Sequence, residues 1–256
     1  MFERWLDEVV ATGNRAAEIG FISPTFTMHS DAGEQRLSRD EWPNWVERNR
    51  PPDWRLTAHD VIAYRDRVGT LFTSAETDPQ TGRTIVKHSI SILRLVAGQF
   101  AEAWIASRSP ECGPWPNLPE NRAGWSVAVD LPAAEEAAIA AAMARCQQIR
   151  QTQEAEVLRE LFVDPMIVHG PSPTREENLD EFVRRVAAEP QTMSGLVMEV
   201  LDCLVAGHKA MLRWSYSYPD STAAQPSPIV GLTLYAFRAG KVIERWQAGL
   251  PPGIGW

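Results

Sequence analysis

The chain has 256 residues, of which 44% are hydrophobic and 23% carry a charge. This composition is typical of a folded globular protein, and the length is sufficient for two domains of ordinary size. The 33 acidic and 25 basic side chains give a formal net charge of −8, which repels nucleic-acid phosphates and anionic lipid. We therefore expect neither a nucleic acid nor a membrane as a partner.

Short motifs for secretion, metals or cofactors are missing from the sequence. The run Met1–Trp5 contains two charges, unlike a signal peptide, and no window approaches the ~18 apolar residues of a membrane span. Cys112, Cys146 and Cys203 form no Cys-x-x-Cys pair, which indicates neither a disulfide framework nor a thiolate zinc site. Phosphate-binding glycine loops and His-x-x-x-His motifs do not occur. We expect a cytoplasmic protein with no metal and no cofactor.

The first half of the chain predicts a helix, a strand, a second helix and then long strands. Ser38 followed by Glu41 is a capping box that marks the second helix, and residues 79–82 and 97–98 are the predicted turns. In chain order the expected elements are a helix at about 2–19, a strand at 26–29, a helix at 38–47, and strand-like runs at about 58–75, 84–96 and 100–106.

The second half begins after a proline-rich segment, residues 109–132, which we interpret as a linker because clustered prolines exclude helix interiors and sheet ladders. Residues 133–162 are rich in Ala, Glu, Gln and Leu and predict one or two helices. The earlier order then returns as a strand at 166–169, a helix at 177–188, and strands at about 195–206, 209–218, 229–237 and 242–248.

The two halves also share sequence. The segment GQFAEAW, from Gly98 to Trp104, returns as GKVIERW, from Gly240 to Trp246, a spacing of 246 − 104 = 142 residues. Further upstream the spacing is 140, which pairs His29 with His169. This period is too long for a solenoid and matches a whole domain. We predict a tandem duplication with domains at 1–108 and 133–256.

Two stretches of the second half carry a family resemblance. Residues 161–169, LFVDPMIVH, followed by a helix and then by residues 234–246, LYAFRAGKVIERW, resemble the nuclear-transport-factor-2-like superfamily and, within it, the SnoaL-like polyketide cyclase group. The resemblance implies an α+β fold of two tandem cones, each a bent antiparallel sheet wrapped around helices and one apolar pocket. Single domains of this family commonly pair through their sheets, which implies an intramolecular pseudo-dimer and leaves further homo-oligomers open.

The fold alone does not fix the reaction, and the catalytic groups of two related enzyme types are absent. Ketosteroid isomerases use a carboxylate base, a tyrosine and a second acid, whose matching positions here hold Ser30 or Gly170, Leu6 or Cys146, and Ile90 or Leu232. The arginine and two aspartates of limonene-epoxide hydrolases match Phe72 or Trp214, Ser74 or Tyr216, and Ala106 or Ala248. Both chemistries are therefore disfavoured, because the side chains that they need are missing.

His29 and His169 are the remaining candidates for catalysis, because an imidazole titrates near neutral pH and exchanges protons readily. Many SnoaL-like members follow this histidine with an aspartate, but Ser30 and Gly170 stand here instead. The alternative is a structural histidine that bonds a backbone carbonyl. His88 is expected to share one strand face with Ile90, Ile92 and Arg94, as a structural or interface residue.

Five further residues are candidates for substrate binding. Arg213 suits an anionic group, large aromatics suit an apolar wall, and Cys146 stands at the position of a pocket-facing tyrosine; the set is Arg213, Trp214, Phe72, Trp42 and Cys146. A surface or inter-domain ion pair is the alternative for Arg213, and core packing is the alternative for the aromatics. For the repeated acidic residues we expect structural roles, as bend acceptors for Asp60 and Asp202 and in edge or interface pairing for Glu102 and Glu244.

Two functions are compatible with these patterns. The first is a cofactor-independent cyclase, isomerase or lyase that acts on a lipophilic, polyketide- or terpenoid-like substrate through His169 or His29. The second is a non-catalytic binding or scaffold protein with an apolar ligand pocket. In both cases we expect the working pocket in residues 133–256, with His169 and Arg213 inside the same cavity.

Overall fold

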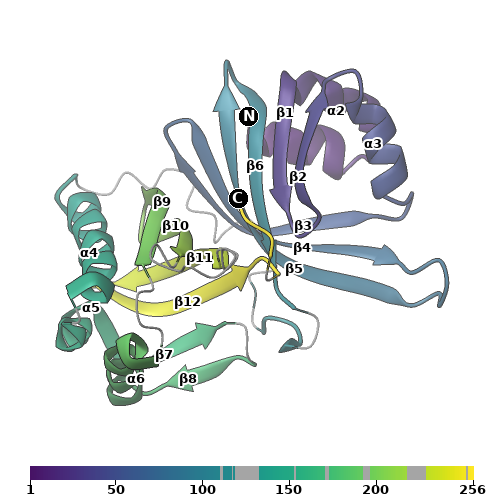
Figure 1. The fold of residues 1–256 in the computed structure, drawn as a ribbon. Helices are drawn as coiled ribbons and strands as arrows, with labels where there is room; N and C mark the ends of the chain where they lie inside the picture. Colours follow the sequence, from purple (N-terminus) through teal and green to yellow (C-terminus); the bar gives the residue numbers. More distant parts are fainter. Residues whose placement is uncertain are drawn as a thin grey trace.

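The computed structural model describes residues 1–109, 112–116, 118, 133–152, 154–170, 173–192, 197–217, 229–251 and 253–256. Most of the predicted linker, 109–132, therefore lies outside the described residues. Among the helices that are described, none is long and apolar enough to cross a membrane. The fold consists of two similar units, each a six-stranded sheet with helices on one face (Figure 1).

The first unit opens with short helical pieces rather than one long helix. The predicted helix at 2–19 is interrupted at Gly13, which has a positive φ of 66°, and Asn14 then caps the next piece by accepting from the amide of Ala17. The elements are α1 (Phe2–Trp5), η1 (Leu6–Val10), α2 (Arg15–Glu18), η2 (Ile19–Phe21), β1 (Ile22–Ser30), β2 (Gly33–Ser38), α3 (Trp42–Asn49), β3 (Arg55–Tyr64), β4 (Arg67–Thr77), β5 (Thr84–Val96) and β6 (Gln99–Ser107).

The second unit repeats this order. Its elements are α4 (Ala133–Thr152), η5 (Ala155–Val157), α5 (Leu158–Leu161), β7 (Phe162–His169), β8 (Arg175–Glu177), α6 (Leu179–Thr192), β9 (Val197–Ala206), β10 (Lys209–Ser217), β11 (Ile229–Arg238) and β12 (Lys241–Gly249). The strand orders, β2-β1-β6-β5-β4-β3 and β8-β7-β12-β11-β10-β9, are the same. The predicted tandem arrangement is confirmed.

Three details of the sheets differ from the prediction. Each sheet is mixed rather than antiparallel, because β1 pairs with β6, and β7 with β12, in parallel. The short strands β2 and β8 have no counterpart among the predicted elements, since each is a brief hairpin partner of β1 or β7 with little alternation of its own. The run predicted at 58–75 is a hairpin, β3–β4, that turns at Arg65, where φ is positive.

The two copies keep the same irregularities of the backbone. Ala97–Gly98 and Ala239–Gly240 both form two-residue turns with positive φ at both positions, as type I′ hairpins require. The register shifts after Arg94 and Ala236 are also equivalent, since 236 − 94 = 142. Bulges and turns re-aim the following side chains, so equivalent positions in the two copies face the same way.

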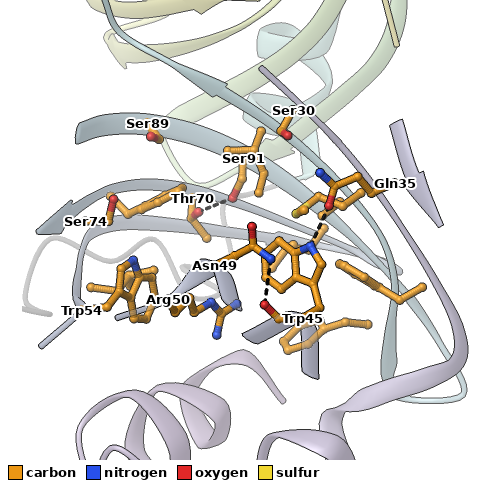
Figure 2. A pocket seen from close by; sticks show the side chains of 18 of the residues that line it. Ser30, Gln35, Trp45, Asn49, Arg50, Trp54, Thr70, Ser74, Ser89 and Ser91 are labelled. Atoms are coloured by element: carbon orange, nitrogen blue, oxygen red, sulfur yellow. Dashed lines mark hydrogen bonds between the residues drawn. The ribbon is translucent and has the colours of Figure 1, made fainter. Parts of the chain in front are cut away.

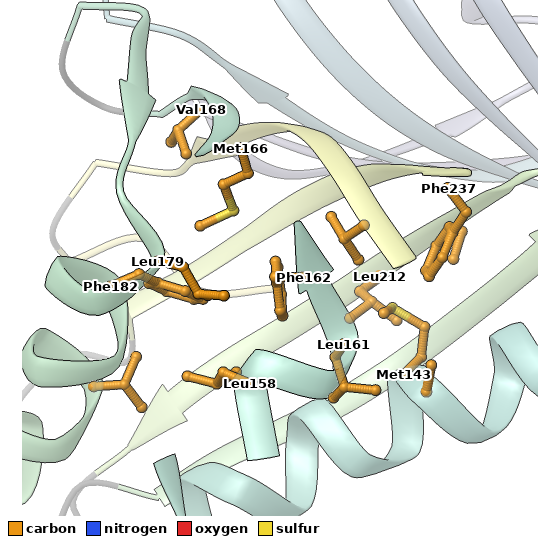
Figure 3. Close-up of a cluster of buried hydrophobic side chains, with 14 of the residues drawn as sticks. Met143, Leu158, Leu161, Phe162, Met166, Val168, Leu179, Phe182, Leu212 and Phe237 are labelled. Atoms are coloured by element: carbon orange, nitrogen blue, oxygen red, sulfur yellow. The ribbon is translucent and has the colours of Figure 1, made fainter. Parts of the chain in front are cut away.

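Both faces of each sheet are covered. One face packs on the helices of its own unit, which forms one apolar core in the first half and a separate one in the second half. Figure 3 shows the core of the second half. The opposite faces pack on each other in a third core, which contains Ile90, Ile92 and Trp104 from the first half and Leu232, Leu234 and Trp246 from the second. Trp115, from the predicted linker, is buried in this shared core.

Ion pairs across the shared core are reciprocal. Asp60 binds Lys209, and Arg67 Nε lies 3.4 Å from Asp202 Oδ2. Asp60 is the counterpart of Asp202, and Arg67 is the counterpart of Lys209, each at a spacing of 142. In an interface with two-fold symmetry, when one residue of the first copy contacts a second residue of the other copy, the same two residues also meet with their copies exchanged. Asp60 also accepts from the amide of Val61 beside a register shift, which confirms its expected role at a strand bend.

Candidate functional site

A cavity of about 320 Å³ lies in the first half, between the inner face of its sheet and the helices α1 and α3 (Figure 2). Side chains that alternate along the strands line it, for example Phe72 and Ser74 from β4, and Ala103 and Ile105 from β6. The cavity is of the size of small-molecule sites. Trp42 and Phe72, two of the residues predicted to bind substrate, do line this cavity.

The helix side of the cavity is an aromatic wall. Trp42 and Trp45 are stacked, with ring centroids 5.1 Å apart, and Trp42 meets Phe26 edge to face at 5.0 Å. The guanidinium of Arg50 lies over the rings of Trp42, Trp45 and Trp54, at 4.7 Å from the last. Its Nη1 donates to both oxygens of the buried Glu18, at 2.8 and 3.0 Å. The protein's own cation therefore occupies the aromatic faces of this wall.

The sheet side of the cavity carries hydroxyl groups. Thr70 Oγ1 lies 2.6 Å from Ser91 Oγ, and these two residues are directly opposite in the β4–β5 ladder. Ser89 Oγ and Ser107 Oγ form a second pair at 3.0 Å between β5 and β6. The remaining lining hydroxyls belong to Ser30 and Ser74 (Figure 2). An apolar cavity with a few convergent polar groups is the usual form of a small-molecule site.

The cavity lacks a group that titrates near neutral pH, because its described lining contains no histidine, cysteine or tyrosine. Of its charged residues, Glu18 is paired with Arg50, and Glu76 Oε1 lies 3.9 Å from Lys87 Nζ. Asp31 is exposed. General acid–base catalysis at neutral pH needs a positioned group with a suitable pKa, and the cavity offers hydroxyls instead.

His29 lies on the opposite face of β1 from the cavity. Met28 and Ser30 line the cavity, so the side chain between them points away from it, to the face of the sheet that carries Trp104. His29 is buried, donates through Nε2 to Glu102 Oε1 at 3.0 Å, and stacks on Trp104 with ring centroids 5.6 Å apart. Glu102 also accepts from Arg94 Nε at 2.9 Å. The predicted role of His29 as acid or base is not supported by this placement.

His169 has the equivalent surroundings in the second half. Its Nε2 lies 2.6 Å from Glu244 Oε1, its Nδ1 lies 2.9 Å from Thr174 Oγ1, and its ring stacks on Trp246 at 5.1 Å. It lines none of the described hollows. A carboxylate holds each histidine, rather than the backbone carbonyl that we considered as the structural alternative. The partners of Glu102 and Glu244 belong to their own domains, so the pairing predicted for them lies within each sheet and not across the interface.

The matching cavity of the second half is nearly filled by its own side chains. Only about 40 Å³ remains, lined by Cys146, Phe162, Phe182 and Trp214 among others. Larger residues stand at four equivalent positions: Trp214 for Phe72, Tyr216 for Ser74, Tyr235 for Leu93 and Arg245 for Ala103. Figure 3 shows how closely the aromatic and aliphatic side chains of this core pack. Trp214 and Cys146 thus border a void too small for a ligand.

Arg213 is also outside the predicted cavity. It points from β10 into the layer between the sheets, where its guanidinium lies 4.1 Å from the ring centroid of Trp104 and Nη2 lies 3.6 Å from Asp202 Oδ2. Burial lowers the pKa of Arg213, while the charges of Asp202 and Glu102 act in the opposite direction. The expectation that Arg213 and His169 share a cavity is wrong, because both face the other sheet.

The second half has one wider hollow, an open groove of about 470 Å³ between α4 and β9. Its lining consists mainly of small apolar side chains, such as Ala137, Ala140 and Val205, with Tyr64 of the first half at its edge. It lacks the paired hydroxyls and the aromatic wall of the first cavity. We therefore take the first cavity as the candidate ligand site.

The hydroxyl row was not recognised from the sequence. Ser89 and Ser91 alternate with Ile90 and Ile92 along β5, and such a pattern usually indicates that the isoleucines face the core of the domain. The isoleucines instead face the partner sheet, and the serines face the cavity. Their equivalents, Gly231 and Thr233, differ in type and conceal the pattern in the second copy.

These features define an α+β protein made of two cone-shaped units, one of which retains a ligand-sized cavity. A family model described as a SnoaL-like domain matches residues 2–103 and again residues 142–245. The chain therefore belongs to the SnoaL-like family and contains two copies of its domain.

Solved structures with a similar fold each align with about half of this chain. A nuclear-transport-factor-2-like protein of unknown function from Mesorhizobium loti is 20% identical over 47% of this chain and 98% of its own, with a TM-score of 0.40. A candidate polyketide cyclase from Acidithiobacillus ferrooxidans is 18% identical over 41% and 84%, with a TM-score of 0.38. IdmH, a candidate polyketide cyclase from Streptomyces antibioticus, is 15% identical over 43% and 91%, with a TM-score of 0.37. No curated protein gives a significant match.

Proposed function

We propose that the protein binds a lipophilic small molecule in the cavity of its first domain and does so without catalysing a reaction. The observation that carries this proposal is the separation of the two candidate sites. The cavity of about 320 Å³ has aromatic and hydroxyl walls, whereas His29 and His169 lie on the far faces of the sheets. Of the two functions compatible with the sequence, the binding function fits this arrangement.

Histidine catalysis fits less well for a geometric reason. A general base must come within hydrogen-bond reach of the proton that it removes, and a strand separates each imidazole from the cavity. Both imidazoles are buried between a tryptophan ring and a glutamate. A cyclase, isomerase or lyase activity would have to use the hydroxyl groups or the charged side chains Asp31, Glu76 and Lys87 of the cavity lining.

The second domain has a supporting role in this proposal. Residues 1–108 and 133–256 form an intramolecular pseudo-dimer, in which the second sheet covers the apolar outer face of the first. The shared core and the reciprocal pairs Asp60–Lys209 and Arg67–Asp202 support this. A domain that need not hold a ligand is free to fill its interior with side chains, which stabilises the fold.

Binding of the neutral fluorescent lipophile N-phenyl-1-naphthylamine tests the proposal. We expect saturable binding to one site per chain. The variant Phe72→Trp/Ser74→Tyr, which gives the first domain the residues of the second, should abolish that binding because the larger side chains fill the cavity. Circular dichroism and thermal unfolding check that the variant remains folded.

The reciprocal variant Trp214→Phe/Tyr216→Ser is the matched control. It enlarges the small void of the second domain and leaves the first cavity intact, so the original site should keep its affinity. If the wild-type protein does not bind the probe, or if Phe72→Trp/Ser74→Tyr binds it as well as the wild type while folded, the proposal is wrong.

A further inference from the structure

The two hydroxyl pairs in the first cavity specify the chemistry of its ligand. In each pair, one hydroxyl donates its proton to the other, and the accepting hydroxyl keeps a proton of its own. For Thr70 and Ser91, and likewise for Ser89 and Ser107, the described residues provide no second hydrogen-bond partner. Each pair therefore retains one O–H donor without a described acceptor, on residues that line the cavity.

These donors are shielded from bulk water. Thr70, Ser89 and Ser91 are 2%, 2% and 4% exposed. Buried donors in proteins nearly always find an acceptor, because an unpaired one costs the free energy of its lost hydration. A ligand that supplies acceptor oxygens at this wall gains that free energy, and a pure hydrocarbon does not.

The charges around the cavity favour an uncharged ligand. Glu18 and Arg50 neutralise each other, and Asp31, Glu76 and Lys87 together leave one excess negative charge, which disfavours an anion. A ligand cation would seek the faces of the tryptophans. Arg50 already lies over Trp42, Trp45 and Trp54.

We infer that the cavity selects uncharged aromatic ketones, whose ring packs on the aromatic wall while the carbonyl oxygen accepts from the Thr70–Ser91 pair. This inference rests on the proposed binding function and adds a chemical selectivity to it. In the second domain the equivalent pair is Leu212 and Thr233, and Thr233 Oγ1 accepts from Trp214 Nε1 at 2.9 Å. The donor pair is therefore confined to the first domain.

Competition of 9-fluorenone and fluorene against N-phenyl-1-naphthylamine tests the inference, because the two competitors share their shape and differ by the carbonyl oxygen. We expect fluorenone to bind the wild type about five- to tenfold more tightly, the effect of one net hydrogen bond. The single variants Thr70→Val and Ser91→Ala each retain one hydroxyl and should keep a preference. The double variant Thr70→Val/Ser91→Ala should lose it while still binding fluorene.

Thr73→Val is the matched control, since it makes the same substitution on the same strand at a side chain that faces away from the cavity and contacts His59. It should keep the wild-type preference. Equal affinity of the wild type for both competitors, or an unchanged preference in the double variant, would overturn the inference and leave the binding function standing. If neither competitor displaces the probe and the probe itself does not bind, the proposed function fails instead.

Discussion

Gly69 and Met211 occupy the same position in the two domains, since 211 − 69 = 142, and they contact each other at the centre of the shared core. A Cβ built on Gly69 would lie 2.7 Å from Met211 Sδ. Only residues on a two-fold axis can meet their own counterparts. The missing side chain on one strand thus makes room for the long side chain on the other.

This contact predicts the effect of exchanging the two residues. Gly69→Met should lower the free energy of unfolding by about 1–3 kcal/mol through overpacking, and Met211→Gly should lower it through a cavity. The double variant Gly69→Met/Met211→Gly should recover most of the loss, because the axis makes the two arrangements equivalent. Urea unfolding measures all three, and simple addition of the two losses would contradict the symmetry.

The ion pairs across the same core predict unequal effects. Asp60 is buried, so Lys209→Met should cost about 3 kcal/mol by removing a cation from a buried carboxylate. Arg67→Met should cost less, because Asp202 keeps Arg213 at 3.6 Å. Thermal and urea unfolding of the two variants show which of them loses more stability. A larger loss for Arg67→Met would show that Arg213 does not compensate.

The buried histidines are predicted to stabilise the fold. His29→Gln and His169→Gln should each lower the free energy of unfolding by about 1.5–3 kcal/mol, the range for a hydrogen bond to a charged group. Both variants should bind N-phenyl-1-naphthylamine as the wild type does, because neither side chain reaches the cavity. If either variant is folded but binds the probe much more weakly, the histidines contribute to the ligand site.

Glu177 and Arg245 form a buried ion pair that helps to fill the second domain. Burial would raise the pKa of Glu177, but the charges of Arg245 and Arg185 outweigh it and hold the pKa below its ordinary value. The carboxylate therefore stabilises the fold above the ordinary pKa of a glutamate, and this contribution is lost as the pH falls through the lowered value.

Glu177→Gln should accordingly cost about 3 kcal/mol at pH 7 and reduce the loss of stability in acid. The first domain has Leu37 and Ala103 at the equivalent positions. The double variant Glu177→Leu/Arg245→Ala should thus be less damaging than Glu177→Gln, as judged by urea unfolding at neutral pH. If Glu177→Leu/Arg245→Ala loses more stability than Glu177→Gln, the ion pair contributes more to stability than the volume that its side chains fill.

His88 predicts a second loss of stability in acid, which comes from a buried neutral histidine and not from a carboxylate. Burial, with the charges of His59 and Arg108, lowers the pKa of His88, so the folded protein holds it neutral. Below its ordinary pKa, about 6.5, the unfolded chain binds the proton more readily, and stability falls as the pH decreases. His88→Gln should flatten the unfolding free energy between about pH 7 and 5. An unchanged slope would exclude His88 as the source.

The sequence by itself determined the duplication, the order of the long elements, the Ala-Gly turns at 97–98 and 239–240, and which residues share a strand face. These properties depend on local periodicity and on the match between the two copies. His88 with Ile90 and Ile92 was placed on one face correctly for this reason.

Only the tertiary structure decided which face looks inward. Alternation has a period of two, so it separates the faces of a strand but does not say what covers each one. Here helices cover one face and the partner sheet covers the other, and the more apolar side chains, such as Ile90 and Trp104, meet the partner sheet. That choice places His29 and His169 on the sheet faces opposite the helices, sets Arg213 against Trp104 of the other domain, and leaves the serines of β5 to line the cavity.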